Sequence, residues 1–142
     1  MKIGKLAQMA AATVAGAITL PASAHADTPQ LFLSPSGDIV CGVGTGNDGK
    51  SSATCEVRDF TWTLPQQCNM GSSNDFNLTQ GNAPEPRCHT DTNFVAGLPT
   101  LPYGQTRSAG PITCDSETSG VTCTDSGTGH FFQVSRESYQ LG

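Results

Sequence analysis

Two histidines are the residues best suited to acid–base chemistry, because imidazole titrates close to neutral pH. His89 follows Cys88 and lies two residues before Asp91, so a histidine–carboxylate pair could activate a serine in a small hydrolase. The sequence has no G-x-S-x-G turn of the kind that presents the serine in many hydrolases. We therefore interpret His89 as a loop histidine beside a bridged cysteine and expect no catalytic residue. A small secreted hydrolase that uses His130 or His89 is kept as an alternative.

The second histidine lies between a glycine-containing turn and an expected strand near the chain end. Together, His130, Arg136, Asp125 and Tyr103 could form a polar cluster that binds an anionic or sugar-like ligand. The other interpretation is structural: His130 and Arg136 satisfy backbone carbonyls, since buried polar groups need hydrogen-bond partners. We prefer the structural interpretation and keep the four residues as a candidate ligand-binding set.

Metal and phosphate chemistry find little support in the spacing of the residues. No C-x-x-C or H-x₃-H pattern exists, so the cysteines do not resemble a zinc site. The run Gly42–Gly46 lacks the lysine and the following helix of a phosphate-binding loop, and we interpret it as the tip of a hairpin. The sequence thus predicts no metal and no cofactor.

Four of the six cysteines occur within a repeated pattern that suggests how they pair. Ile39-Val40-Cys41 followed by Ala53-Thr54-Cys55 resembles Ile112-Thr113-Cys114 followed by Val121-Thr122-Cys123. Strand alternation places the cysteines of each copy on one face, opposite each other in a β-hairpin. This pattern predicts the bridges Cys41–Cys55 and Cys114–Cys123, and Cys68–Cys88 follows by elimination among the fifteen connectivities that six cysteines allow.

The remaining segments are short and are separated by turn residues. We expect strands at Phe60–Leu64, Phe76–Leu78, Phe94–Val95 and His130–Ser135, and one helical turn within Ser135–Leu141. Turn signals every ~8–12 residues are typical of a sandwich or a barrel. The predicted fold class is therefore all-β: a small disulfide-stapled sandwich or barrel built from short antiparallel hairpins.

The first 26 residues have the features of a secretory signal peptide. Lys2 and Lys5 precede an apolar stretch of about 15 residues, Leu6–Leu20, and small residues follow Pro21. The apolar stretch is shorter than the ~20 residues that span a bilayer. We expect cleavage after Ala26, which leaves residues 27–142 as a single secreted, extracytoplasmic domain without a membrane span.

The composition after residue 26 limits both stability and partners. All 12 acidic residues but only five of the seven basic residues lie there, so the domain is acidic and has no basic patch. Nucleic acid, whose phosphates need clustered Lys and Arg, is therefore not an expected partner. Leu, Ile, Val and Phe make up about 18% of these residues, so the core is lean, and disulfides formed in an oxidising compartment compensate for it.

Several motifs resemble a known family. Ser34–Cys41 reads SPSGDIVC, Leu101–Gly104 reads LPYG, Gly120–Cys123 reads GVTC and Thr128–Arg136 reads TGHFFQVSR. These segments are similar to small exported actinobacterial proteins of the mycobacterial type, which are classed as a domain of unknown function. The resemblance covers nearly all of the chain after residue 26 and implies export, one disulfide-bonded domain and no assigned activity. Phe131 departs from the family pattern, which has glycine there.

These observations together favour a non-enzymatic binding module at or outside the cell envelope. Its expected partner is an unknown protein or envelope component, and we expect the protein to be a monomer. A secreted protease inhibitor is the second alternative, with Leu98–Gly104 or Ala83–Arg87 as the disulfide-held reactive loop.

Overall fold

The computed structural model describes residues 11–18, 28–64, 68 and 73–142. Within them, ten strands and no helix form two five-stranded antiparallel sheets. The strands are β1 Gln30–Leu33, β2 Ile39–Thr45, β3 Ser51–Val57, β4 Ser73–Thr79, β5 Glu85–His89, β6 Thr106–Ala109, β7 Ile112–Glu117, β8 Gly120–Asp125, β9 Phe131–Val134 and β10 Tyr139–Leu141. The described residues contain no helix long and apolar enough to cross a membrane.

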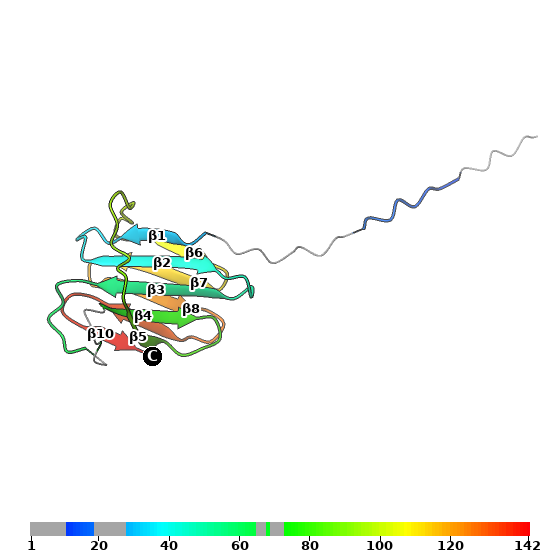
Figure 1. Cartoon of the computed structure of the whole chain (residues 1–142). Helices are drawn as coiled ribbons and strands as arrows, with labels where there is room; N and C mark the ends of the chain where they lie inside the picture. Colours follow the sequence, from blue (N-terminus) through cyan, green and yellow to red (C-terminus); the bar gives the residue numbers. More distant parts are fainter. Residues whose placement is uncertain (1–10, 19–27, 65–67, 69–72) are drawn as a thin grey trace, which may run out of the picture.

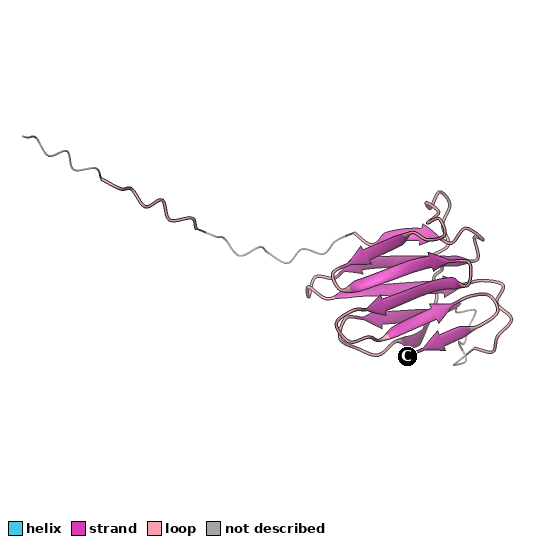
Figure 2. Ribbon diagram, turned by 180° about the vertical axis from the view of Figure 1, so that it is seen from behind, coloured by secondary structure: helices cyan, strands magenta, loops and turns pink. Residues whose placement is uncertain are grey.

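Each sheet is a simple meander in which consecutive strands are neighbours. The first sheet has the order β1-β2-β3-β4-β5 and the second has the order β10-β9-β8-β7-β6. The sheets lie face to face, with β2, β3 and β4 packed against strands of the second sheet (Figures 1 and 2). Neither sheet closes on itself, so of the two expected architectures the protein adopts the sandwich.

The two predicted hairpins form the centre of the sandwich. In β2 and β3, Cys41 lies opposite Cys55, and in β7 and β8, Cys114 lies opposite Cys123. The three disulfides join Cys41–Cys55, Cys68–Cys88 and Cys114–Cys123, which are the pairs that the sequence predicts. The Sγ atoms of Cys55 and Cys123 are 3.8 Å apart, so the bridges of the two hairpins meet across the interface between the sheets.

The internal repeat extends to a third strand in each sheet. Phe76 on β4 lies opposite Cys55, and Phe132 on β9 lies opposite Cys123. Both rings are fully buried, with their centroids 6.3 Å apart. A Cys-Cys-Phe row therefore crosses the middle of each sheet, and the two rows form the centre of the core.

Other core residues alternate with outward-facing ones along the strands, as the pleat requires. On β2 and β3, Ile39, Val43, Ala53 and Val57 are buried in the core cluster. Leu101 joins this cluster from the segment that connects the two sheets. The core is closed with few large side chains, because the central bridges fill volume that aliphatic residues would otherwise occupy.

Three of the predicted local structures are wrong. Phe60–Leu64 forms no strand: Phe60 and Trp62 stack with their centroids 4.0 Å apart and pack against the core instead. Phe94–Val95 is also irregular. The chain end makes no helical turn, because Tyr139–Leu141 pairs with β9 as strand β10. In each case tertiary packing or edge pairing decides the local structure.

Most of the expected signal peptide lies outside the described residues, including the cleavage point after Ala26. Of this region the structure describes residues 11–18, which are exposed and belong to neither sheet (Figure 1).

Candidate functional site

The outer face of the first sheet carries a groove of about 530 Å³. This volume lies within the range of about 300–1,000 Å³ that is typical of ligand pockets. The groove crosses the sheet from Leu31 on β1, over Gly42 and Gly44 on β2 and Thr54 on β3, to Arg87 on β5. Nearly every strand of the sheet therefore contributes to one concave surface.

The floor of the groove exists because β2 has glycine at alternate positions. Val43 points into the core, so Gly42 and Gly44 face outward on the other side of the pleat. Neither glycine has a positive φ, so the backbone itself does not require glycine at these positions. The Leu31 side chain lies over Gly42, since its Cδ2 is 2.8 Å from the position that a Cβ would take there. Gly44 leaves backbone without a side chain in the floor of the groove. Our prediction that Gly42 and Gly44 belong to a hairpin tip was wrong, because β2 continues to Thr45 and the tip follows it.

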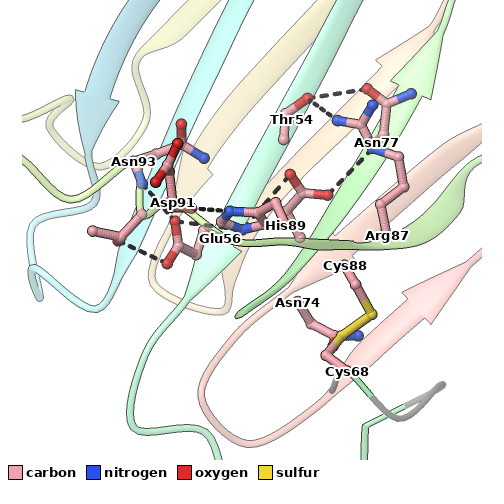
Figure 3. Close-up of polar contacts among 12 residues, drawn as sticks. Thr54, Glu56, Cys68, Asn74, Asn77, Arg87, Cys88, His89, Asp91 and Asn93 are labelled. Atoms are coloured by element: carbon pink, nitrogen blue, oxygen red, sulfur yellow. Dashed lines mark hydrogen bonds and ion pairs between the residues drawn. A yellow bond between two sulfur atoms is a disulfide. The ribbon is translucent and has the colours of Figure 1, made fainter. Parts of the chain in front are cut away.

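Polar side chains form a connected network at the β3–β5 end of the groove (Figure 3). Arg87 donates from Nε to Asp75 Oδ1 at 3.3 Å and from Nη2 to the Thr54 hydroxyl at 3.3 Å. The Thr54 hydroxyl donates to Asn77 Oδ1 at 3.0 Å. These contacts fix the guanidinium over the sheet, while the Arg87 side chain remains 45% exposed.

A second part of the network holds the connecting segment 90–105 against the sheet. Glu56 on β3 is buried, and its Oε2 accepts the backbone N–H of Asn93 at 2.8 Å. Its Oε1 accepts the Thr92 hydroxyl at 2.9 Å. In Figure 1 the segment runs in front of the first sheet from β5 toward β1. Asn93 lines the groove, so Glu56 positions one of its walls.

His89 lies between the carboxylates of Glu56 and Asp75, and Figure 3 shows it beside Glu56. Its Nε2 is 3.8 Å from Glu56 Oε2 and 3.9 Å from Asp75 Oδ2, and its Nδ1 contacts the backbone oxygen of Asp91. Both ring nitrogens therefore face oxygen atoms of the protein. Nε2 is buried and makes no hydrogen bond to the described residues.

The electrostatics of the groove depend on how Asp75 is balanced. Burial raises the pKa of the Asp75 carboxyl above its ordinary value, while the Arg87 guanidinium and the nearby His89 act in the opposite direction. Asp75 and Arg87 form an ion pair at 3.3 Å. Within the groove, this acid and this base offset each other, so the lining is close to electrically neutral.

The second repeat provides an internal comparison for the glycine floor. Counted from the first cysteine of each copy, the positions of Gly42 and Gly44 correspond to Asp115 and Glu117 in the second sheet. Residues with side chains therefore occupy the equivalent outward positions of an equivalent hairpin. The repeat itself therefore does not require glycine, although in the first sheet glycine at position 42 makes room for Leu31, whose Cδ2 is 2.8 Å from the position of a Cβ.

The buried carboxylates are also specific to the first repeat. Glu56 follows the second cysteine of its copy, where the other copy has Thr124. Asp75 precedes the central phenylalanine, where the other copy has Phe131. Glu56 has a structural role, because it holds the connecting segment. The groove and the Asp75–Arg87 pair are features of the first sheet that have no counterpart at the equivalent positions of the second.

The sequence-predicted ligand set does not come together as one cluster. Asp125 and His130 lie at one end of the β8–β9 pair, where the Asp125 N–H donates to the His130 carbonyl at 2.8 Å. The Asp125 carboxylate is buried and accepts the backbone N–H groups of Gly81 at 2.7 Å and Gly127 at 2.9 Å. These bonds lower the pKa of Asp125, with the Gly81 bond as the largest cause. Asp125 therefore ties the β4–β5 turn of one sheet to the other sheet.

Tyr103 and Arg136 lie together in a smaller hollow of about 230 Å³ that does not include Asp125 or His130. Arg136 donates from Nε to the Asp59 carbonyl at 3.2 Å. His130 Nδ1 is 3.3 Å from the Gly142 carbonyl oxygen. Both side chains thus contact backbone carbonyls, which is the structural interpretation that the sequence favoured.

The two proposed inhibitor loops are held in the fold. In Leu98–Gly104, Leu101 is fully buried and its N–H donates to the Leu33 carbonyl at 2.9 Å. In Ala83–Arg87, the residues from Glu85 onward pair with β4. An extended ligand segment needs a free backbone to add to a partner, and these segments use theirs internally.

Sequence reasoning missed the groove and its network. The signal for the floor was glycine at every second position of a strand whose other positions are apolar. Glu56, Asp75 and Arg87 carried no local signal, because only the register of β3, β4 and β5 brings them together.

The fold and this site define a class: a disulfide-bonded antiparallel β-sandwich with a polar groove on one outer face. A family of unknown function, DUF6636, matches residues 12–141, and the chain belongs to this family. No curated protein and no solved structure matches the chain. The three disulfides fit an extracellular, oxidising location.

Proposed function

We propose that the protein is a non-enzymatic extracytoplasmic binding module whose ligand site is the groove on the first sheet. The observation that supports this most strongly is the difference between the two repeats. The first has an outward glycine strip and two buried carboxylates, and the second has Asp115, Glu117, Thr124 and Phe131 at the equivalent positions. Burying carboxylates is costly unless they are well paired. Glu56 is used to hold the connecting segment, so the glycine at position 44 and the half-exposed Arg87, held by the buried Asp75, are the features that point to binding.

The contacts of His89 favour binding over hydrolysis. A histidine that activates a hydroxyl needs one free ring nitrogen within hydrogen-bond reach of that hydroxyl. In the described part of the chain, Nδ1 contacts the Asp91 carbonyl, and Nε2 is buried without a hydrogen-bond partner, 3.8 Å from Glu56 Oε2 and 3.9 Å from Asp75 Oδ2. A buried nitrogen that faces two carboxylates is poorly placed to activate a hydroxyl for an incoming substrate. The nearby Thr92 hydroxyl bonds to Glu56 instead.

A capture experiment with a groove-filling variant tests the proposal. The oxidised protein and its Gly44→Val variant would each be immobilised and exposed to envelope extract from the producing cell. Valine suits an outward strand position, so the variant should fold with an unchanged circular dichroism spectrum while its side chain fills the floor. We expect the variant to lose components that the wild type retains. Identical capture by both proteins would contradict the proposal.

A further inference from the structure

We propose that the groove binds a neutral oligosaccharide. This inference rests on the proposed function, because it names the ligand class of the same site. The groove combines a bare backbone floor with hydroxyl, carboxylate, amide and guanidinium groups at its walls, and each of these features suits a polyhydroxylated ligand of low charge.

The balance of charges in the groove lining argues against strongly charged ligands. Arg87 is the basic residue of the groove lining, and Asp75 already pairs with it at 3.3 Å. The domain as a whole has more acidic than basic residues. An anionic ligand would therefore meet no unpaired cation in the lining and would approach an acidic protein. A cation would compete with Arg87 for Asp75.

The hydrogen-bonding groups match hydroxyls, which both donate and accept. Asp75 accepts, Arg87 donates, and the hydroxyls of Ser52 and Thr54 can do either. The Arg87 guanidinium is a planar donor that remains 45% exposed and can bond two adjacent hydroxyls at once, whereas the Asp75 side chain is only 6% exposed and mainly holds Arg87. Their mutual bond and the Thr54–Asn77 contact hold them in place before a ligand arrives, which reduces the entropy lost on binding.

The floor is suited to the C–H faces of sugar rings. Gly44 presents only backbone, and next to it the Leu31 side chain lies over Gly42 and adds an apolar surface. A ring could therefore approach the sheet closely while its hydroxyls point toward the walls. In the second sheet, Asp115 and Glu117 would block the same approach.

An extended peptide fits less well. Peptides that add to a sheet bond to an edge strand through their main chain. The floor strand β2 is already paired on both sides, with β1 and β3. Its backbone groups are used within the sheet and offer a peptide little main-chain bonding.

The test uses an array of neutral and acidic oligosaccharides and four forms of the oxidised protein. The variants are Gly44→Val, which fills the floor, Thr54→Val, which removes a wall hydroxyl, and Thr122→Val. Thr122 precedes the second cysteine of its repeat as Thr54 does, but it lies on the other sheet, so it is the matched control. Circular dichroism and thermal unfolding establish that all four are folded.

We expect the wild type and Thr122→Val to bind at least one neutral oligosaccharide equally well. Gly44→Val and Thr54→Val should each weaken that binding by roughly tenfold or more, which corresponds to about 1.4 kcal/mol. Binding only to acidic oligosaccharides, with the same sensitivity to the variants, would overturn the neutral-ligand inference and leave the proposed function standing. If no oligosaccharide binds but an envelope protein is captured by wild type and lost in Gly44→Val, the ligand class is wrong and the binding site is right. If no ligand of any kind depends on Gly44, both proposals fail.

Discussion

The two types of disulfide in the protein should contribute to stability through different physical effects. Cys114 and Cys123 are separated by nine residues and are fully buried at the centre of the core. Cys68 and Cys88 are separated by 20 residues at the edge of the first sheet, where Cys88 is exposed. Loop closure alone predicts that the longer loop matters more, with about 3.3 kcal/mol against about 2.7 kcal/mol.

Packing reverses that order. Replacing both central cysteines with alanine, in C114A/C123A, removes two buried sulfurs beside the Cys55 Sγ. Each methyl-sized void costs about 1 kcal/mol, which brings the expected loss to about 5 kcal/mol. In C68A/C88A solvent can fill the space, so the loss should stay near the loop-closure value of about 3 kcal/mol.

Urea unfolding at 25 °C measures both losses as changes in the free energy of unfolding. A typical domain has about 5–15 kcal/mol in total, so all variants would be measured in one concentration of a stabilising osmolyte to keep C114A/C123A folded. Unfolding of C114A/C123A alone under these conditions agrees with the reasoning. A loss in C68A/C88A that equals or exceeds the loss in C114A/C123A would refute it.

Three further results are expected. Asp125→Asn should flatten the fall of stability in acid. The pKa of the wild-type carboxyl is lowered in the folded protein, so its contribution to the free energy of unfolding is present above the ordinary pKa and is lost as pH falls through the folded pKa. Urea unfolding from pH 6 to pH 3 measures this loss. Gly120→Ala should lower the free energy of unfolding by at least about 3 kcal/mol, because φ is +127° there and a Cβ would overlap a carbonyl oxygen of β9. Gly104→Ala, where φ is +81° and the surrounding space is open, should lower it by about 1 kcal/mol. Equal losses of stability in the two variants would contradict this account. Glu56→Gln should speed amide hydrogen exchange at Asn93, because the wild-type Asn93 N–H donates to a carboxylate oxygen and a neutral amide is a weaker acceptor. Unchanged protection of this N–H would show that Glu56 does not hold the connecting segment.

The parts of the fold that depend on local alternation could be predicted from the sequence. Cys41 and Cys55 lie in one hairpin, so the pleat alone places them on the same face and opposite each other. The same reasoning gave the second hairpin and the sandwich class. The same reasoning was wrong around Trp62, where alternating residues predicted a strand. The alternation there reflects packing against the core: Trp62 Nε1 donates to the Ser135 carbonyl at 2.9 Å, and its ring packs against the core without strand pairing.

The groove could not be predicted, because its residues are joined by long-range register. Asp75 and Arg87 become neighbours only when β4 and β5 pair, and Glu56 receives Asn93 only when the connecting segment crosses the sheet. The glycine pattern that includes Gly44 could be recognised in the sequence, but alternate glycines next to a turn are also typical of a flexible hairpin tip. The alternating apolar residue Val43 was the feature that distinguished a strand from that tip.

Among the described strands, the chain passes from one sheet to the other once, through residues 90–105, and none of the three bridges joins the sheets. A single proteolytic cut within Ala96–Leu98 would therefore yield two covalently separate fragments, one with two disulfides and one with a single disulfide. Only the packed core and hydrogen bonds such as the one from Gly81 to Asp125 would hold them together. Reassembly of such fragments becomes a concentration-dependent, bimolecular reaction, and its affinity would directly measure how strongly one half of the duplicated sandwich recognises the other.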